Sequence, residues 1–211
     1  HPILSENIAV VHNGIIENHD EIRLELKEKN VVFETSTDTE VIPHLLSILM
    51  KENKNFFDAC VSVVKKIEGA YAFAAIHSLK EEIFVARKTS PLVLGLGDGY
   101  NIVGSDAQSI SHMVNEVIYL NDGDYAILNK TNFQIYDFNN NEVKREKINI
   151  KSNLNFLNKD GYKHFMEKEI HEQPNVLINT IGSLVREEND LNIFPEKMNI
   201  QKNYGITICA A

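Results

Sequence analysis

Between residues 69 and 150 the chain alternates short apolar, β-branched runs with turn sequences, and this pattern constrains the fold most strongly. Turn sequences such as Asp122-Gly123 and Asn139-Asn140-Asn141 are typical of connections between antiparallel strands. Parallel strands would need long crossovers, which this region lacks. We therefore predict antiparallel sheets with helices packed outside them, an α+β domain. The expected strands lie in 70–79, 81–88, 91–106, 116–130, 132–138 and 142–150, the last three forming a meander.

In the N-terminal third of the chain, the apolar residues recur at different spacings. Residues 7–16 form an apolar run that predicts a buried strand, and residues 30–38 predict a second, shorter strand. Residues 40–53 and 55–69 repeat apolar side chains at helical spacing. Thr37 or Asp38 would cap the first of these helices, and Gly69 would end the second.

The composition narrows the class of protein. The formal net charge of −9 argues against a nucleic-acid binder, which needs a positive face for phosphates. The two cysteines, Cys60 and Cys209, have neither zinc-site spacing nor a disulfide framework, which favours a reducing, cytoplasmic setting. No apolar run approaches the roughly 18 residues of a membrane span.

The strand predicted at 7–16 contains His12-Asn13-Gly14, where we expect it to be interrupted. Asn-Gly is a strong hairpin signal, so a simple turn is one interpretation. The other is an oxyanion site, in which the Asn13 amide and the Gly14 backbone N–H aim at one developing negative oxygen. Glycine would allow the backbone to approach closely. The apolar Ile15-Ile16 that follows, with a helix after it, weakens the hairpin interpretation.

Asp38 also has two interpretations, a helix cap or a carboxylate that holds an ammonium group. The neighbouring sequence does not distinguish these two interpretations of Asp38.

Cys60 lies in the apolar stripe of a predicted helix and Cys209 in an apolar terminal run, so we predict core positions for both and reject both as nucleophiles. The remaining histidines lack metal-ligand spacing.

Several motifs together resemble a known family. They are His1-Pro2, VVHNGIIEN at 10–18, TDTEVI at 37–42, GAYAFA at 69–74, ARKTSPLVLGLG at 86–97, YLNDGDYAIL at 119–128 and YKHFMEKEIHEQP at 162–174. The HNG and TDTE motifs resemble class II glutamine amidotransferases, which carry an N-terminal nucleophile. The segment at 162–174 resembles the sequence that leads from the glutaminase of glutamine–fructose-6-phosphate aminotransferases into their sugar isomerase domain.

The resemblance implies a four-layer α-β-β-α sandwich of two antiparallel sheets, the N-terminal nucleophile hydrolase type. Residues 1–153 would be the glutaminase domain. Residues 154–211 would be a linker, a helix over 162–185 and the first strand of an α/β sugar isomerase domain. Because Pro174 lies within that helix, we expect a kink or a boundary near Gln173. The terminal run at 204–211 would be the strand.

The resemblance also implies the chemistry. An N-terminal cysteine attacks the glutamine amide, and the released ammonia converts fructose-6-phosphate into glucosamine-6-phosphate. By matching position, Asn13 and Gly14 are expected to form the oxyanion hole and Asp38 to bind the α-amino group of glutamine. His1 and His12 are given supporting roles. The family implies no metal and no cofactor. It suggests a homodimer through the isomerase domain.

The sequence departs from the family at both ends. The Cys-Gly-Ile start and the Arg-Trp-x-Thr-His loop are absent, and Cys209-Ala210-Ala211 replaces the usual Cys-Gly-Thr. We therefore expect a fragment that lacks its nucleophile and is inactive alone. The alternatives are a non-catalytic glutamine-binding or regulatory relative on the same fold, and an amidotransferase with another acceptor.

Overall fold

The computed structural model describes residues 1–52, 54–150 and 161–184. The chain divides into two compact units, residues 1–154 and 155–211. The strands are β1 (Ile3–Ser5), β2 (Ile8–Ile16), β3 (Gly69–His77), β4 (Ile83–Lys88), β5 (Val93–Leu96), β6 (Asn101–Gly104), β7 (Glu116–Tyr119), β8 (Tyr125–Leu128), β9 (Phe133–Tyr136), β10 (Glu142–Val143) and β11 (Lys147–Asn149). The helices are α1 (His19–Glu28), the 3-10 turn η1 (Asp38–Glu40), α2 (Val41–Lys51), α3 (Phe56–Lys66), α4 (Ala107–Ile110) and α5 (Phe165–Leu184).

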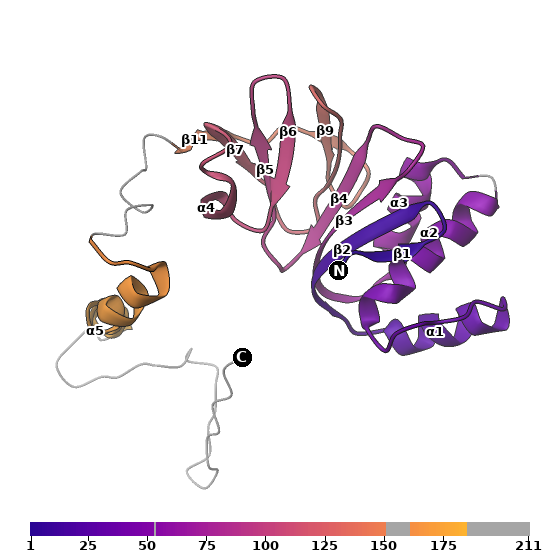
Figure 1. Cartoon of the computed structure of the whole chain (residues 1–211), viewed down its shortest axis with the longest axis horizontal. Coiled ribbons are helices and arrows are strands. Elements are labelled where there is room, and N and C mark those ends of the chain that lie inside the picture. The colour runs from indigo at the N-terminus through magenta and orange to yellow at the C-terminus, as the bar shows by residue number, and fades with distance from the viewer. Residues whose placement is uncertain (53, 151–160, 185–211) are drawn as a thin grey trace, which may run out of the picture. The chain divides into compact units, whose positions relative to one another are not determined.

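The strands of the first unit form two sheets (Figure 1). One has seven strands in the order β1-β2-β3-β4-β8-β9-β10, and the other has four in the order β11-β7-β5-β6. All the pairings are antiparallel. The predicted α+β fold with two antiparallel sheets is confirmed.

Helices α1, α2 and α3 lie against one face of the seven-stranded sheet (Figure 1). Their apolar stripes meet every second side chain of the strands, because successive side chains in a strand point to opposite faces. Val10 and Ile16 of β2, Phe84 of β4, Leu46 of α2 and Cys60 of α3 belong to this core. The predicted core position of Cys60 is confirmed, whereas Cys209 lies outside the described residues.

The opposite face of the seven-stranded sheet carries a second core. Ala72 and Val85 contribute from that sheet, and Leu94 and Ile118 from the four-stranded sheet. At the neighbouring Gly95, a Cβ would meet the side chain of Ile110, the last residue of α4. The layers are therefore helices, sheet and sheet. Within the described residues, the predicted fourth layer consists of the four-residue helix α4.

The predicted meander over 116–150 is only partly correct. β8, β9 and β10 follow one another in the seven-stranded sheet, but β7 and β11 belong to the four-stranded sheet. The chain therefore crosses between the sheets before β8 and again after β10. The buried Asp124 carboxylate accepts from the Arg145 guanidinium at 2.7 and 2.8 Å, which ties the two crossings together. A period-2 pattern cannot reveal which sheet a strand joins.

The strand predicted at 30–38 is wrong, because residues 31–37 form neither helix nor strand. Side chains, not a neighbouring strand, satisfy the backbone of this segment. Glu40 accepts from the N–H groups of Glu34 and Thr35, and Arg23 donates to the carbonyl oxygens of Thr35 and Thr37. We call residues 34–37 the Asp38 approach, because they lead directly into Asp38.

Two predicted helix boundaries also differ from the structure. α3 ends at Lys66, and Gly69 begins β3 instead of ending the helix. α5 continues through Pro174, without the boundary that was one expectation near Gln173. The linker expected near 154 and the strand expected at 204–211 fall outside the described residues, so the start of an isomerase domain stays a prediction. None of the described helices combines the length and apolarity that a membrane span requires.

Candidate active site

β2 carries the first two candidate residues. It runs without a break from Ile8 to Ile16 and pairs with β3 throughout. The expected interruption at His12-Asn13-Gly14 is therefore wrong, and so is the hairpin interpretation. Within β2, the backbone departs from ordinary strand geometry at Gly14, whose φ of 120° is rarely adopted by residues with a side chain. A Cβ there would lie 2.0 Å from the Ala70 carbonyl oxygen, so the glycine allows the two backbones to approach.

The pleat of β2 sends neighbouring side chains to opposite faces. His12 points into the helix-covered core and is 6% exposed. Asn13 points to the other face, opposite Ala72 of β3, and is exposed. Val11 and Ile15 flank it on that face and are 46% and 65% exposed. The Asn13 amide is therefore accessible to a ligand.

Asp38 is brought to the end of the same strand. It opens η1, where the Thr37 side chain accepts from the N–H of Thr39. Thr37 therefore caps this 3-10 turn, whereas the predicted helix α2 begins one turn later, after Glu40, without a side-chain cap, so the expected cap of that helix is wrong. One Asp38 oxygen, Oδ2, accepts the N–H of Ile16 at 2.7 Å. Among the described residues, the other oxygen, Oδ1, has only long contacts with the Thr37 and Thr39 hydroxyls, at 3.3 and 3.5 Å. Oδ1 therefore retains capacity to accept a hydrogen bond from a bound cation.

His1 and His12 meet at the buried hydroxyl of Thr39. The Thr39 oxygen lies 2.9 Å from Nδ1 of His12 and 3.2 Å from Nε2 of His1. Burial lowers the pKa of His12 from its ordinary value, and the Asp38 carboxylate offsets part of that shift. His12 is therefore uncharged at neutral pH. Its Nε2 atom is buried and has no hydrogen-bond partner among the residues that the structure describes.

The structure thus gathers Asp38, His12 and His1 around Thr39, and places Asn13 and Gly14 on the adjoining strand. Sequence reasoning missed Thr39 and Glu40. The Thr37-x-x-Glu40 spacing is a capping-box signal, which would direct the Glu40 carboxylate to the N–H of Thr37. Glu40 instead binds the Asp38 approach further upstream. The capping-box spacing thus singles out Glu40 correctly, but it predicts the wrong hydrogen-bond partner for its carboxylate.

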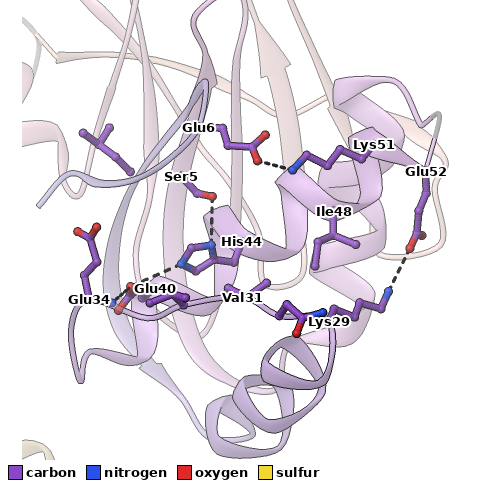
Figure 2. Close-up of a pocket in the computed structure, with 13 residues that line it drawn as sticks. Ser5, Glu6, Lys29, Val31, Glu34, Glu40, His44, Ile48, Lys51 and Glu52 are labelled. Carbon is purple, nitrogen blue, oxygen red and sulfur yellow. Dashed lines mark hydrogen bonds and ion pairs between the residues drawn. The ribbon is translucent and has the colours of Figure 1, made fainter.

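The arrangement suits a substrate with an ammonium group and a carbonyl that becomes an oxyanion. Asp38 offers a carboxylate oxygen for the ammonium, and Asn13 and Gly14 are amide donors suited to an oxyanion. A pocket of about 600 Å³ lies elsewhere, between β1, α2 and the segment after α1 (Figure 2). Glu40 and His44 line that pocket, but none of the predicted site residues does.

Comparison with known proteins decides the family. A family model described as a glutamine amidotransferase domain matches residues 1–112, just over half of the chain. The chain belongs to the glutamine amidotransferase domain family. The matched range of this amidotransferase domain contains all five predicted site residues, His1, His12, Asn13, Gly14 and Asp38.

Curated relatives of this amidotransferase domain share one description, glutamine–fructose-6-phosphate aminotransferase (isomerizing). The protein of Rhizobium leguminosarum bv. viciae is 40% identical over 88% of the chain and 31% of the relative. That of Pseudomonas putida is 42% identical over 90% and 32%. That of Thermotoga maritima is 42% identical over 93% and 32%. The chain spans about a third of the length of these relatives, and the resemblance seen in the sequence is confirmed.

Solved structures support the fold. Glutamine phosphoribosylpyrophosphate amidotransferase from B. subtilis, complexed with ADP and GMP, matches with a TM-score of 0.57 and 24% identity, over 67% of this chain and 32% of that one. A second structure, described as the allosteric regulatory enzyme of purine biosynthesis, has a TM-score of 0.55 and 26% identity, over 65% and 31%. The two-sheet amidotransferase fold is therefore shared with these structures.

Proposed function

We propose that this chain is the glutaminase part of a glutamine–fructose-6-phosphate aminotransferase. The observation that carries the proposal is the anchoring of Asp38 to β2 through the N–H of Ile16, which leaves Oδ1 for a substrate ammonium group beside Asn13-Gly14. The identity of about 40% to relatives with that description supports the choice among amidotransferases.

In the proposed reaction, a cysteine thiolate attacks the side-chain amide carbon of glutamine. The carbonyl oxygen becomes an oxyanion, which accepts hydrogen bonds from the Asn13 amide and the Gly14 N–H. Collapse of the intermediate breaks the C–N bond, and ammonia leaves with the proton taken from the thiol. Water then hydrolyses the thioester, which releases glutamate and restores the thiol.

The nucleophile is proposed to come from residues of the complete protein outside this chain. Cys60 does not suit the role, because it is fully buried in α3 and burial raises the pKa of its thiol well above its usual value. The isolated chain should therefore not hydrolyse glutamine. Fructose-6-phosphate binding, transfer of ammonia to it and homodimer formation are likewise proposed for the complete protein.

The test uses the complete protein that contains this chain. It should release ammonia and glutamate from glutamine, and form glucosamine-6-phosphate when fructose-6-phosphate is added. Asp38→Asn keeps an oxygen for the N–H of Ile16 but removes the charge, so it should raise the KM for glutamine about 10- to 100-fold, as expected for a lost charge-assisted hydrogen bond. Asp20→Asn, a highly exposed aspartate on α1, is the matched control and should leave the KM unchanged.

The other outcomes separate the alternatives. An unchanged KM in Asp38→Asn would remove Asp38 from ammonium binding. Glutamine hydrolysis without any glucosamine-6-phosphate would overturn the acceptor assignment. Glutamine binding without turnover, measured by calorimetry on the complete protein, would support the non-catalytic relative instead.

A further inference from the structure

Glu40 is a buried carboxylate two residues after Asp38, at the other end of η1. Its side chain is 3% exposed, at the start of α2. A carboxylate removed from water is costly unless hydrogen bonds replace the lost hydration. Three donors do so here, the N–H of Glu34 at 2.7 Å, the N–H of Thr35 at 2.9 Å and the Thr35 hydroxyl.

All three donors belong to the Asp38 approach, which is neither helix nor strand. A second side chain holds the same segment by donating to its carbonyl oxygens, whereas Glu40 accepts from its N–H groups. Arg23 of α1 donates to the carbonyl oxygens of Thr35 at 2.9 Å and Thr37 at 2.7 Å, and stacks 4.3 Å above the Phe33 ring. Glu40 thus accepts hydrogen bonds from the N–H groups of the segment, and Arg23 donates hydrogen bonds to its carbonyl groups.

On the helix side, Glu40 faces the His44 ring. Figure 2 shows it between the Asp38 approach and His44, whose Nε2 lies 3.5 Å from Oε1 of Glu40. Nδ1 of His44 lies 3.1 Å from the Ser5 hydroxyl on β1. Burial alone would raise the pKa of Glu40, but the hydrogen bonds from Thr35 and Glu34 outweigh it and the net shift is downward. Glu40 therefore stays ionised at neutral pH.

We propose that Glu40 is a positioning residue that fixes Asp38 for binding the ammonium group of the substrate, because its carboxylate pins the backbone of residues 34 and 35. This role rests on the proposed function. Arg23 holds the carbonyl groups of this segment and Glu40 its N–H groups, and Asp38 follows residue 35 within three residues. A shift of the segment would therefore move the Asp38 carboxylate before it disturbed Asn13 or Gly14, which β2 and β3 hold in register.

The test is steady-state kinetics of glutamine hydrolysis by the complete protein carrying Glu40→Gln. Glutamine keeps the size of the side chain but turns an NH₂ group toward the three donors, so one contact becomes repulsive. The KM for glutamine should rise about tenfold, the equivalent of one weakened charge-assisted hydrogen bond, while kcat changes less than about twofold. Glu52→Gln at the end of α2, in an exposed ion pair with Lys29, is the control and should leave both constants unchanged.

A double variant separates positioning from a general structural defect. If Glu40 acts through Asp38, adding Glu40→Gln to Asp38→Asn should raise the KM little further, because the charge it positions is already gone. Additive increases would overturn the proposal. So would an equal fall of kcat and kcat/KM in Glu40→Gln alone, or an unchanged KM.

A milder variant covers the case in which Glu40→Gln does not fold, which thermal melting would reveal. Thr35→Val removes only the hydroxyl donor and should raise the KM about two- to threefold, and an unchanged KM would then overturn the proposal. Failure of the proposed function looks different. In that case the wild-type complete protein releases no ammonia, or Asp38→Asn has a normal KM, and the role of Glu40 falls with it.

Discussion

The two faces of β2 differ in what their side chains do. Toward the helices, Val10 and Ile16 are fully buried in the larger core. On the other face, Val11 and Ile15 are largely exposed, and Asn13 lies between them. One strand therefore contributes to stability with one set of alternate residues and presents the candidate chemistry with the other.

On the face of the seven-stranded sheet that points away from the helices, the degree of coverage changes from strand to strand. Ala72 and Val85 are covered by Leu94 and Ile118 of the four-stranded sheet. Nothing among the described residues covers Ile15 to the same extent. The candidate site lies on the part of the seven-stranded sheet that remains open, so substrate and further residues of the complete protein can reach Asn13. This contrast leads to the predictions that follow.

The largest stability difference is expected between adjacent isoleucines. Ile16→Ala removes buried methylenes and leaves a cavity, so it should lower the free energy of unfolding by about 3 to 4 kcal/mol. Ile15→Ala, at 65% exposure, should change it by less than about 0.5 kcal/mol. Urea unfolding of the chain, followed by circular dichroism, measures both. Similar losses in the two variants would mean that the two faces of β2 are equally packed.

A smaller effect is expected from pH at His12, on the buried face. Because its pKa is lowered in the folded state, folding favours the neutral ring. The stabilisation is present above the unfolded pKa of about 6.5 and is lost as the pH falls through that value toward the lower folded pKa. The charge of the Asp38 carboxylate opposes this lowering of the pKa, and the Thr39 hydroxyl hydrogen-bonds Nδ1 of His12.

The variant His12→Gln isolates this contribution. The free energy of unfolding of the wild type, measured in urea, should fall more between about pH 7.5 and pH 5 than that of His12→Gln. His112→Gln, at an exposed position after α4, should keep the wild-type dependence. Equal pH dependence in the wild type and His12→Gln would show that His12 is not held neutral by burial.

Much of this arrangement could be predicted from the sequence. The strands in 70–88 and the helices from residues 40 and 55 follow from local periodicity, which the cores confirm. The position of Cys60 follows from its place in an apolar stripe. Asn13, Gly14 and Asp38 could be singled out through motifs, although their roles are tested by kinetics and not by their positions.

The errors share a physical cause. The segment around Phe33 has strand-like residues, but Glu40 and Arg23 hydrogen-bond the backbone of residues 34–37 that follow it, and such contacts leave no periodic signal. β7 and β8 have similar patterns but join different sheets, and the Asp124–Arg145 pair at the crossings leaves no periodic signal either. His12-Asn13-Gly14 suggested a break because Asn-Gly is common in turns. Pairing with β3 instead keeps the strand continuous, and only glycine fits at position 14.

The most direct measurement is the rate of ammonia release from glutamine by the complete protein carrying Asn13→Ala. Loss of one oxyanion donor should lower kcat by roughly 10²- to 10³-fold with little change in KM. Asn132→Ala, in the exposed turn between β8 and β9, should match the wild type. A wild-type kcat in Asn13→Ala would contradict the assignment of the outer face of β2 as the catalytic face.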